Sequence, residues 1–270
     1  MGKIEYNFKN TRCCGKVKMM NEMKNYFKGK KFLLLGGTSG IGYDIANSLL
    51  QEGATVIATG RNLKKLEVLK TKYDEKNIVI KFVDFGEQSS FENFDISDYK
   101  LDGLISTVGI CMNIPAKLSD YNKVLYSMKV NFLGPVTLIN KLIRKKRFNE
   151  GSSIVLLSSI SGCSTTSVGL SNYSASKAAL IGYTRAVALE ISPKIRINCV
   201  SPGTVNTQSG MFLETLDKMS EESKETEFSR YPLKLGKPED VSNMVKFLLS
   251  PAASWITGQN FIIDGGRTLK

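Results

Sequence analysis

The sequence predicts an α/β protein with a single doubly wound parallel sheet and helices on both faces. Short apolar runs of strand length alternate with stretches of helical periodicity along most of the 270 residues. The first apolar run leads through a glycine-rich turn into a helix and then a second run, as in a β-α-β unit. We see no internal repeat and no sign of a second folded domain, so one core is expected.

The basic residues are concentrated near the N-terminus. Residues 1–31 contain nine of the 37 basic residues and two of the 25 acidic ones. Residues 1–28 have no clear hydrophobic period, and we interpret them as a basic, disordered extension, with residues 29–270 forming the folded domain. A solvated tail is the simplest interpretation of the extension, contact with a polyanion is the alternative, and we expect no nucleic-acid partner.

Composition excludes several kinds of chemistry. The chain has no histidine, which removes serine and cysteine triads that use an imidazole and any zinc site that needs one. The five cysteines lack metal-ligand spacing, so we expect no metal site and reduced thiols. No apolar run reaches the ~20 residues of a membrane span, and no secretory leader is visible. We therefore expect a cytoplasmic protein with no membrane contact.

The first predicted β-α-β unit contains a candidate phosphate site. A strand at 30–35 runs into Gly36-Gly37-Thr38-Ser39-Gly40-Ile41-Gly42, and a helix at 43–50 and a strand at 54–59 follow. Glycines without Cβ allow a pyrophosphate to approach the free N–H groups and the positive dipole end of the helix. The alternative is a tight turn that binds nothing.

The end of the second strand bears on the choice of cofactor. Sites selective for NAD usually have an acidic residue there that binds the ribose 2′-hydroxyl. This chain has Gly60-Arg61-Asn62, without a carboxylate. Arg61 could pair with a 2′-phosphate, which favours NADP(H), although an exposed arginine without a ligand is the alternative.

The remaining elements follow the same alternation. After a charged helix at 63–72, the sequence predicts strands at 78–83 and 101–109, a long helix at about 120–147 with Asn131 in its middle, and a strand at 153–157. A helix containing residues 173–177 and a strand at 195–200 come next. The charged segment at about 206–231 is expected to form a mobile lid, before a helix at 238–249 and a last strand at 260–263.

Tyr173 and Lys177 are four residues apart, which places them on one face of a helix. A nearby ammonium favours the phenolate, so we expect Lys177 to lower the pKa of Tyr173 towards neutrality and allow acid–base work. Taken alone, this spacing also occurs by chance in ordinary helices.

Together these motifs resemble the short-chain dehydrogenase/reductase family over about residues 29–266. The motifs that carry the resemblance occur in the expected order, namely the glycine loop, Asp84, Asn131, Ser159, Tyr173-x-x-x-Lys177, Pro202-Gly203 with Thr207, Gly236-x-Pro238-Glu239-Asp240, Thr257-Gly258-Gln259 and Asp264-Gly265-Gly266. The resemblance implies a Rossmann fold, a homotetramer or homodimer packed through the helices that contain Asn131 and Tyr173, and a nicotinamide cofactor.

The resemblance also implies roles for individual residues. Tyr173 would protonate a substrate carbonyl oxygen, Ser159 would hydrogen-bond the same oxygen, and Lys177 would hold the nicotinamide ribose. Asn131 would fix a water in the proton relay, and Ser158 competes with Ser159 for the serine role. The cofactor would be bound by Gly36, Thr38, Ser39, Gly40, Ile41, Gly42, Arg61, Asp84, Gly109, Tyr173, Lys177, Pro202, Gly203 and Thr207.

Two departures from the family pattern affect the supporting network. Leu35 stands where threonine usually precedes the glycine loop, and Ser106-Thr107-Val108-Gly109 replaces the usual Asn-Asn-Ala-Gly. Neither removes a group that does chemistry.

The expected function is an NADPH-dependent reduction of a carbonyl, in a ketone or a 3-oxoacyl thioester, either as a small molecule or bound to an acyl carrier. Sugar or polyol dehydrogenation is an alternative substrate class. A catalytically idle NADP-binding sensor or scaffold is the alternative from another class. We expect the substrate pocket around 111–115, 163–170 and 204–212.

Overall fold

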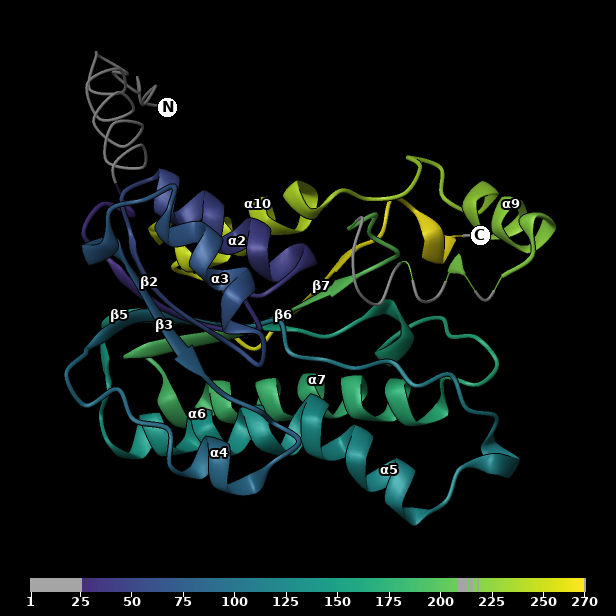
Figure 1. The fold of residues 1–270 in the computed structure, drawn as a ribbon, viewed down its shortest axis with the longest axis horizontal. Coiled ribbons are helices and arrows are strands. Elements are labelled where there is room, and N and C mark those ends of the chain that lie inside the picture. The colour runs from purple at the N-terminus through teal and green to yellow at the C-terminus, as the bar shows by residue number, and fades with distance from the viewer. Residues whose placement is uncertain (1–25, 208–212, 214–215, 218, 270) are drawn as a thin grey trace, which may run out of the picture.

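Figure 1 shows the chain as a computed structural model, which describes residues 26–207, 213, 216–217 and 219–269. These residues form a parallel sheet of seven strands in the order β3-β2-β1-β4-β5-β6-β7. The strands are β1 (Lys31–Leu35), β2 (Thr55–Gly60), β3 (Ile78–Phe82), β4 (Leu101–Ser106), β5 (Phe148–Leu157), β6 (Ile195–Pro202) and β7 (Asn260–Ile263). The predicted doubly wound parallel sheet is confirmed.

Helices cover both faces of the sheet, as Figure 1 shows. On one face lie α2 (Gly40–Gln51), α3 (Leu63–Lys70) and α10 (Pro238–Leu249). On the other lie α4 (Gln88–Glu92), α5 (Tyr121–Met128), α6 (Gly134–Arg144) and α7 (Ser171–Ile191). The short helix α9 (Glu221–Ser229) lies near the C-terminus, beyond the carboxyl ends of the strands. The middle strands are buried because both of their faces are covered, which explains their almost uninterrupted apolar sequence.

Strand order reverses between β1 and β4, which pair with each other at the centre of the sheet. The chain leaves β1 towards one face and β4 towards the other, so a crevice forms at the carboxyl ends of these strands. The glycine loop follows β1, and Thr107–Ile110 follows β4. The fold therefore brings the predicted cofactor and catalytic residues to one edge of the sheet.

Several boundaries differ from the sequence prediction. The long helix expected at 120–147 is interrupted by a π-helical turn, Lys129–Leu133, and ends at Arg144. The chain turns at Lys146, which has a φ of 52°, and β5 already begins at Phe148 rather than at residue 153. Helix α4 was not predicted, because its five residues are too few to show a helical period.

The chain is packed upstream of the boundary predicted at residue 28. Phe27 is buried, and its ring centroid lies 5.7 Å from that of Phe32 on β1. Residues 1–25 of the predicted extension lie outside the described residues, as do 208–212, 214–215 and 218 of the predicted lid. Within the described part of the chain, no helix has the length and apolar character needed to cross a membrane.

Candidate active site

Tyr173 and Lys177 both lie in the first part of α7 and face the crevice, as their spacing predicts. The Lys177 Nζ lies 5.9 Å from the centroid of the Tyr173 ring. Nζ donates hydrogen bonds to the carbonyl oxygens of Leu157 (2.8 Å) and Val108 (3.1 Å), which end β5 and follow β4. A buried ammonium is thus held by the end of β5 and by the loop after β4. Two backbone carbonyls carry no signal in a sequence, so this anchoring could not be predicted.

The pKa values of the pair differ from the sequence prediction. Burial raises the pKa of the Tyr173 phenol to about 12, an effect that its hydrogen bond with Ser159 opposes. Burial also lowers the pKa of the Lys177 ammonium to about 8. The expectation that Lys177 lowers the pKa of Tyr173 is therefore wrong for the protein alone, because desolvation sets the direction of the shift and the ammonium is turned towards two carbonyls.

Ser159 is the serine that contacts the tyrosine. It follows β5, its side chain is hydrogen-bonded to Tyr173, and its Oγ also accepts a hydrogen bond from the Ser161 N–H at 3.2 Å. Ser158 instead donates to the Lys177 carbonyl oxygen at 2.8 Å and is buried there. The two serines therefore have separate contacts, Ser159 with Tyr173 and Ser158 with the Lys177 carbonyl.

Asn131 lies in the π-helical turn between α5 and α6 and is fully buried. Its Oδ1 accepts from the Ile110 N–H at 2.7 Å, and its Nδ2 donates to the Ile110 carbonyl and to the Ser176 Oγ, both at 2.9 Å. Ser176 in turn donates to the Tyr173 carbonyl oxygen at 2.7 Å. Both amide hydrogens of Asn131 are thus used within the protein, so the expected water would bind through Oδ1 or the backbone.

The π-helical turn explains how an asparagine can occupy the middle of a helical stretch. Such a turn adds one residue to the helix and turns side chains out of the regular register, and it is often found at functional sites. Here it turns Asn131 towards the loop after β4. The low helix propensity of asparagine is offset by its three hydrogen bonds.

The glycine loop has the shape of a phosphate cradle. A Cβ on Gly42 would lie 2.6 Å from the Thr107 Oγ1 and would also overlap the Gly36 carbonyl, and Gly40 has a φ of +54°. The loop leads into α2, whose Ser39 N-cap makes no side-chain capping bond, so the first N–H groups of the helix point to the crevice without that partner. The predicted loop residues Gly36, Thr38, Ser39, Gly40, Ile41 and Gly42 fit a pyrophosphate in this way.

Thr107, which is itself one of the departures from the family pattern, supports the glycine loop next to Leu35. Its Oγ1 donates to the Gly36 carbonyl at 2.8 Å and lies 3.1 Å from the Leu35 carbonyl. Thr107, which follows β4, thereby supports the glycine loop that follows β1. β4 is the strand that pairs with β1 at Leu35. The sequence alone does not reveal this support, because a contact between two separate loops is invisible along the chain.

The residues predicted to select the cofactor lie at the end of β2. A Cβ on Gly60 would overlap the Thr38 side chain, which places the glycine loop directly on this end of the strand. Arg61 follows and is exposed, while the Asn62 Oδ1 accepts from the Lys65 N–H and caps α3. Asp84 lies after β3, and its Oδ1 accepts from the Gly86 N–H at 2.8 Å.

The other predicted cofactor residues lie across the crevice. A Cβ on Gly109 would be 3.0 Å from the Lys177 Nζ, so Gly109 leaves room for the ammonium. Pro202 ends β6, Gly203 donates to the Ile263 carbonyl, and Thr207 packs against Gly40. The segment after β6 therefore spans from the sheet to the glycine loop.

Two of the three loops expected to form the substrate pocket, 111–115 and 163–170, are joined by a hydrogen bond. The Ile114 N–H donates to the Gly169 carbonyl at 2.9 Å, and the Asn172 side chain donates to the Ser119 Oγ at 2.6 Å. The third, 204–212, is described only as far as Thr207.

Comparisons with known proteins agree with this geometry. The family model described as enoyl-(acyl carrier protein) reductase matches residues 36–268. The 3-oxoacyl-(acyl-carrier-protein) reductase FabG of Rickettsia felis is 35% identical over 247 residues, which cover 89% of this chain and 98% of that protein. Human dehydrogenase/reductase SDR family member 4 is 32% identical over 88% of this chain and 87% of its own length.

Solved structures give the same result for the fold. A 4-hydroxyisoleucine dehydrogenase mutant complexed with NADH and succinate superposes with a TM-score of 0.80 and 28% identity, covering 89% of this chain and 99% of that one. Motifs, topology and relatives are consistent with one another. The chain belongs to the short-chain dehydrogenase/reductase family and is an oxidoreductase acting on carbonyl or hydroxyl groups.

Proposed function

We propose that this protein is an NADPH-dependent reductase that transfers a hydride to a substrate carbonyl in a ketone or a 3-oxoacyl thioester. The observation that carries the proposal is the contact between the Ser159 side chain and the half-buried Tyr173 phenol, next to the ammonium of Lys177. Two hydroxyl donors that meet at one point can hold a carbonyl oxygen while negative charge develops on it.

Each side chain of the group has a separate task in the proposal. The bound nicotinamide cofactor supplies the hydride. Tyr173 gives its proton to the carbonyl oxygen, and its raised pKa keeps it protonated until then. Ser159 donates a second hydrogen bond to the same oxygen. Lys177 has three ammonium hydrogens and uses two on Val108 and Leu157, which leaves the third for the ribose of the cofactor.

The choice of NADP(H) is supported by charge at the end of β2. Arg61 is exposed there, directly after Gly60, which borders Thr38 of the glycine loop, and the turn Gly60-Arg61-Asn62 has no carboxylate of its own to repel a 2′-phosphate. A 4-hydroxyisoleucine dehydrogenase structure contains NADH, which supports the nicotinamide class for this chain. The phosphorylated form is proposed on the basis of Arg61.

The substrate class is supported by the relatives. The Rickettsia protein is named as a reductase of 3-oxoacyl groups on acyl carrier protein, and this chain covers almost its whole length. We therefore propose a 3-oxoacyl thioester on an acyl carrier as the first substrate to be tested, with simple ketones next.

The proposal is tested by NADPH oxidation over a panel of ketones and 3-oxoacyl thioesters, with wild-type protein and Tyr173→Phe. The variant should lose at least about 100-fold in turnover, because it lacks only the proton donor, and should bind NADPH almost as the wild type does. Tyr183→Phe is the matched control, since this tyrosine lies on the same helix but donates to Asn140 instead. Wild-type turnover by Tyr173→Phe would refute the mechanism, and NADPH binding without turnover on any substrate would favour the idle sensor.

A further inference from the structure

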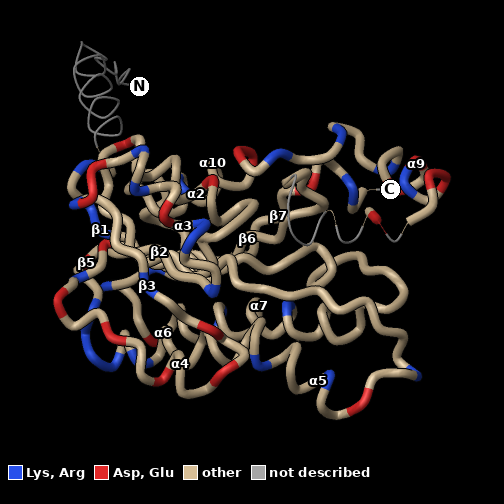
Figure 2. The backbone as a smooth tube through the Cα atoms, in the orientation of Figure 1, with Lys and Arg blue, Asp and Glu red and all other residues tan. Residues whose placement is uncertain are grey.

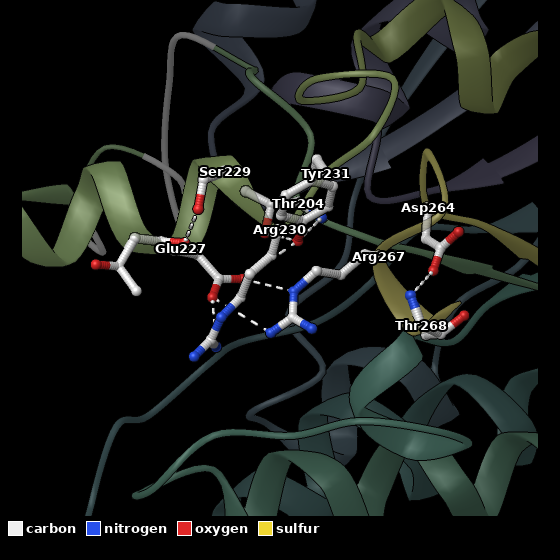
Figure 3. Close-up of polar contacts among 9 residues, drawn as sticks. Thr204, Glu227, Ser229, Arg230, Tyr231, Asp264, Arg267 and Thr268 are labelled. Carbon is white, nitrogen blue, oxygen red and sulfur yellow. Dashed lines mark hydrogen bonds and ion pairs between the residues drawn. The ribbon is translucent and has the colours of Figure 1, made fainter. Parts of the chain in front are cut away.

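A cluster of polar side chains lies outside the catalytic group, at the carboxyl end of β6 (Figure 3). Its centre is the Glu227 carboxylate on α9, which faces the guanidinium of Arg267 near the C-terminus. The Arg267 Nε lies 3.1 Å from Oε1, and its Nη2 lies 3.3 Å from Oε2. The Arg267 side chain is only 7% exposed, so this fork-to-fork pair lies largely out of water.

Tyr231 connects this ion pair to the loop that follows β6. The Arg267 guanidinium lies 5.9 Å from the centroid of the buried Tyr231 ring. The Tyr231 hydroxyl donates to the Thr204 Oγ1 at 2.7 Å and accepts from the Thr204 N–H at 3.1 Å. Glu227, Arg267, Tyr231 and Thr204 therefore form one chain of contacts between α9, the C-terminal turn and β6.

The Asp264-Gly265-Gly266 motif places Arg267 in this cluster. Asp264 accepts hydrogen bonds from the N–H groups of Gly266 (3.0 Å) and Thr268 (2.7 Å), and the second of these is seen in Figure 3. Gly265 has a φ of +59°, and a Cβ on Gly266 would lie 3.0 Å from the Pro232 ring. The turn is thus closed by its own aspartate and packs against the segment after Tyr231.

The loop held by Tyr231 borders the cofactor crevice. A Cβ on Gly203 would lie 3.1 Å from the Tyr231 ring, and Thr207 packs on Gly40 of the glycine loop. Between them, Asn206 donates to the Gly236 carbonyl at 2.8 Å. Because β6 is next to β5, which leads to Ser159, the start of this loop lies on the side of the crevice where the catalytic group is, away from Arg61, which follows β2.

We propose that Arg267 is a positioning residue that, through Glu227 and Tyr231, holds residues 203–207 in the conformation that binds the nicotinamide half of the cofactor. The inference rests on the proposed function. Arg267 touches neither substrate nor cofactor in this proposal. We expect its effect to fall on one half of the dinucleotide, because Tyr231 holds Thr204 at the β6 end of the segment, whereas Thr207 at the other end packs on Gly40 of the glycine loop.

The test compares two ligands that share only the adenosine end. Dissociation constants of NADPH and of 2′,5′-ADP, which lacks the nicotinamide half, are measured by calorimetry for wild type and Arg267→Gln. Removing a charged, buried hydrogen-bond partner should weaken NADPH about tenfold. The affinity for 2′,5′-ADP should be unchanged. A role in stability alone would change the melting temperature and leave the ratio of the two constants as it is.

Two further variants serve as a control and as an independent test of the same contact. Arg230→Gln is the matched control, because Arg230 also pairs with Glu227, at 3.1 Å, but its side chain is 49% exposed. It should leave both constants unchanged. Tyr231→Phe removes only the hydroxyl that holds Thr204, and it should reproduce the selective loss of NADPH affinity even if Arg267→Gln does not fold.

The outcomes separate this inference from the proposed function. Selective weakening of NADPH by Arg267→Gln or Tyr231→Phe, with Arg230→Gln unchanged, supports the positioning role. Equal weakening of both ligands, or no change in either, overturns it. Wild-type protein that bound neither nucleotide would refute the proposed function itself.

Discussion

Lys177 is an ammonium in the interior of the protein, and its surroundings explain why it can remain there. The side chain is almost fully buried, and two backbone carbonyls from neighbouring strands accept its hydrogen bonds. Burial without a carboxylate partner disfavours the ammonium form of Lys177 and lowers its pKa to about 8. A lysine that the site needs for chemistry therefore lowers the stability of the empty protein at neutral pH.

The pH dependence of stability tests this conclusion in protein without ligand. In the folded protein Lys177 releases its proton near pH 8, whereas the unfolded chain keeps it until about pH 10.5. Between these values Lys177 binds more protons in the unfolded state, so its contribution to the free energy of unfolding rises with pH. Relative to Lys177→Met, the free energy of unfolding should increase by about 2 kcal/mol from pH 8 to pH 10. Urea unfolding of both proteins measures it, and a flat or falling difference would show that Lys177 titrates normally.

Arg61 is the residue on which the cofactor choice depends. Replacing it by alanine removes a charged donor from the proposed 2′-phosphate site, so the Kd of NADPH should rise about tenfold while that of NADH stays nearly the same. Lys64→Ala, another exposed cation just beyond β2, controls for general charge and should affect both cofactors little. Equal losses of NADPH and NADH on Arg61→Ala would mean that Arg61 does not meet the phosphate.

At the scale of single residues, the reactive side chains could be proposed from the sequence, whereas the residues that hold them in place could not. Tyr173 and Lys177 stand out because a phenol and an ammonium occur four residues apart, and Ser159 was expected from the resemblance to the family. Thr107 and Arg267 act through contacts with distant parts of the chain, and their own neighbours in sequence give no hint of it. The direction of the Tyr173 pKa shift was predicted wrongly because burial cannot be judged from sequence.

At the scale of elements, the glycine loop is fixed by space rather than by flexibility. Gly42→Ala would push a methyl group into the Gly36 carbonyl and the Thr107 hydroxyl. We expect a lower melting temperature and NADPH binding weakened at least several-fold, because the loop must move away from its cradle shape. Thermal unfolding and calorimetry measure the two effects.

Gly182→Ala provides the comparison for that variant. Gly182 is exposed on α7, and a Cβ there would meet no atom within 4 Å. Alanine should raise helix stability by up to about 1 kcal/mol and leave NADPH binding intact. If both glycine variants behaved alike, the steric account of the loop would be wrong.

Elements that are clear apolar runs were predicted well, whereas features that depend on distant contacts were not. The buried strands β1, β2 and β6 are apolar runs and were placed to within one or two residues. The π-helical turn at Asn131 was not predicted, because it depends on three hydrogen bonds to α7 and to the loop after β4. The early start of β5 depends on pairing with its neighbours, as at Leu101–Phe148, which local sequence does not encode.

For the whole molecule, charge gives little indication of a partner surface. Figure 2 shows basic and acidic residues interspersed over both helical layers of the described chain. Apolar exposure is more informative. Tyr121, Val124 and Leu125 follow an i, i+3, i+4 pattern on α5 and are all exposed, which gives this helix an apolar outer face. We infer that this face takes part in the expected homodimer or homotetramer.

A charge on that face should break the assembly. Val124→Asp would bury a carboxylate in the interface, so light scattering at micromolar concentration should give the mass of one 29.8 kDa chain instead of a multiple of it. Val168→Asp is the control, because Val168 is 91% exposed in a loop and lies outside α5. An unchanged mass for Val124→Asp, or a monomeric wild type, would contradict this assignment.

The central place of β1 in the sheet has a consequence for how the chain is made. β1 is synthesised first among the strands, yet one of its edges pairs with β4, which follows only after β2 and β3. Until then, Phe32–Leu35, fully buried in the finished protein, keep an open apolar edge. Such delayed parallel pairing slows folding and favours aggregation of the nascent chain. A chaperone that shields the first hundred residues until β4 has been made should therefore increase the soluble yield.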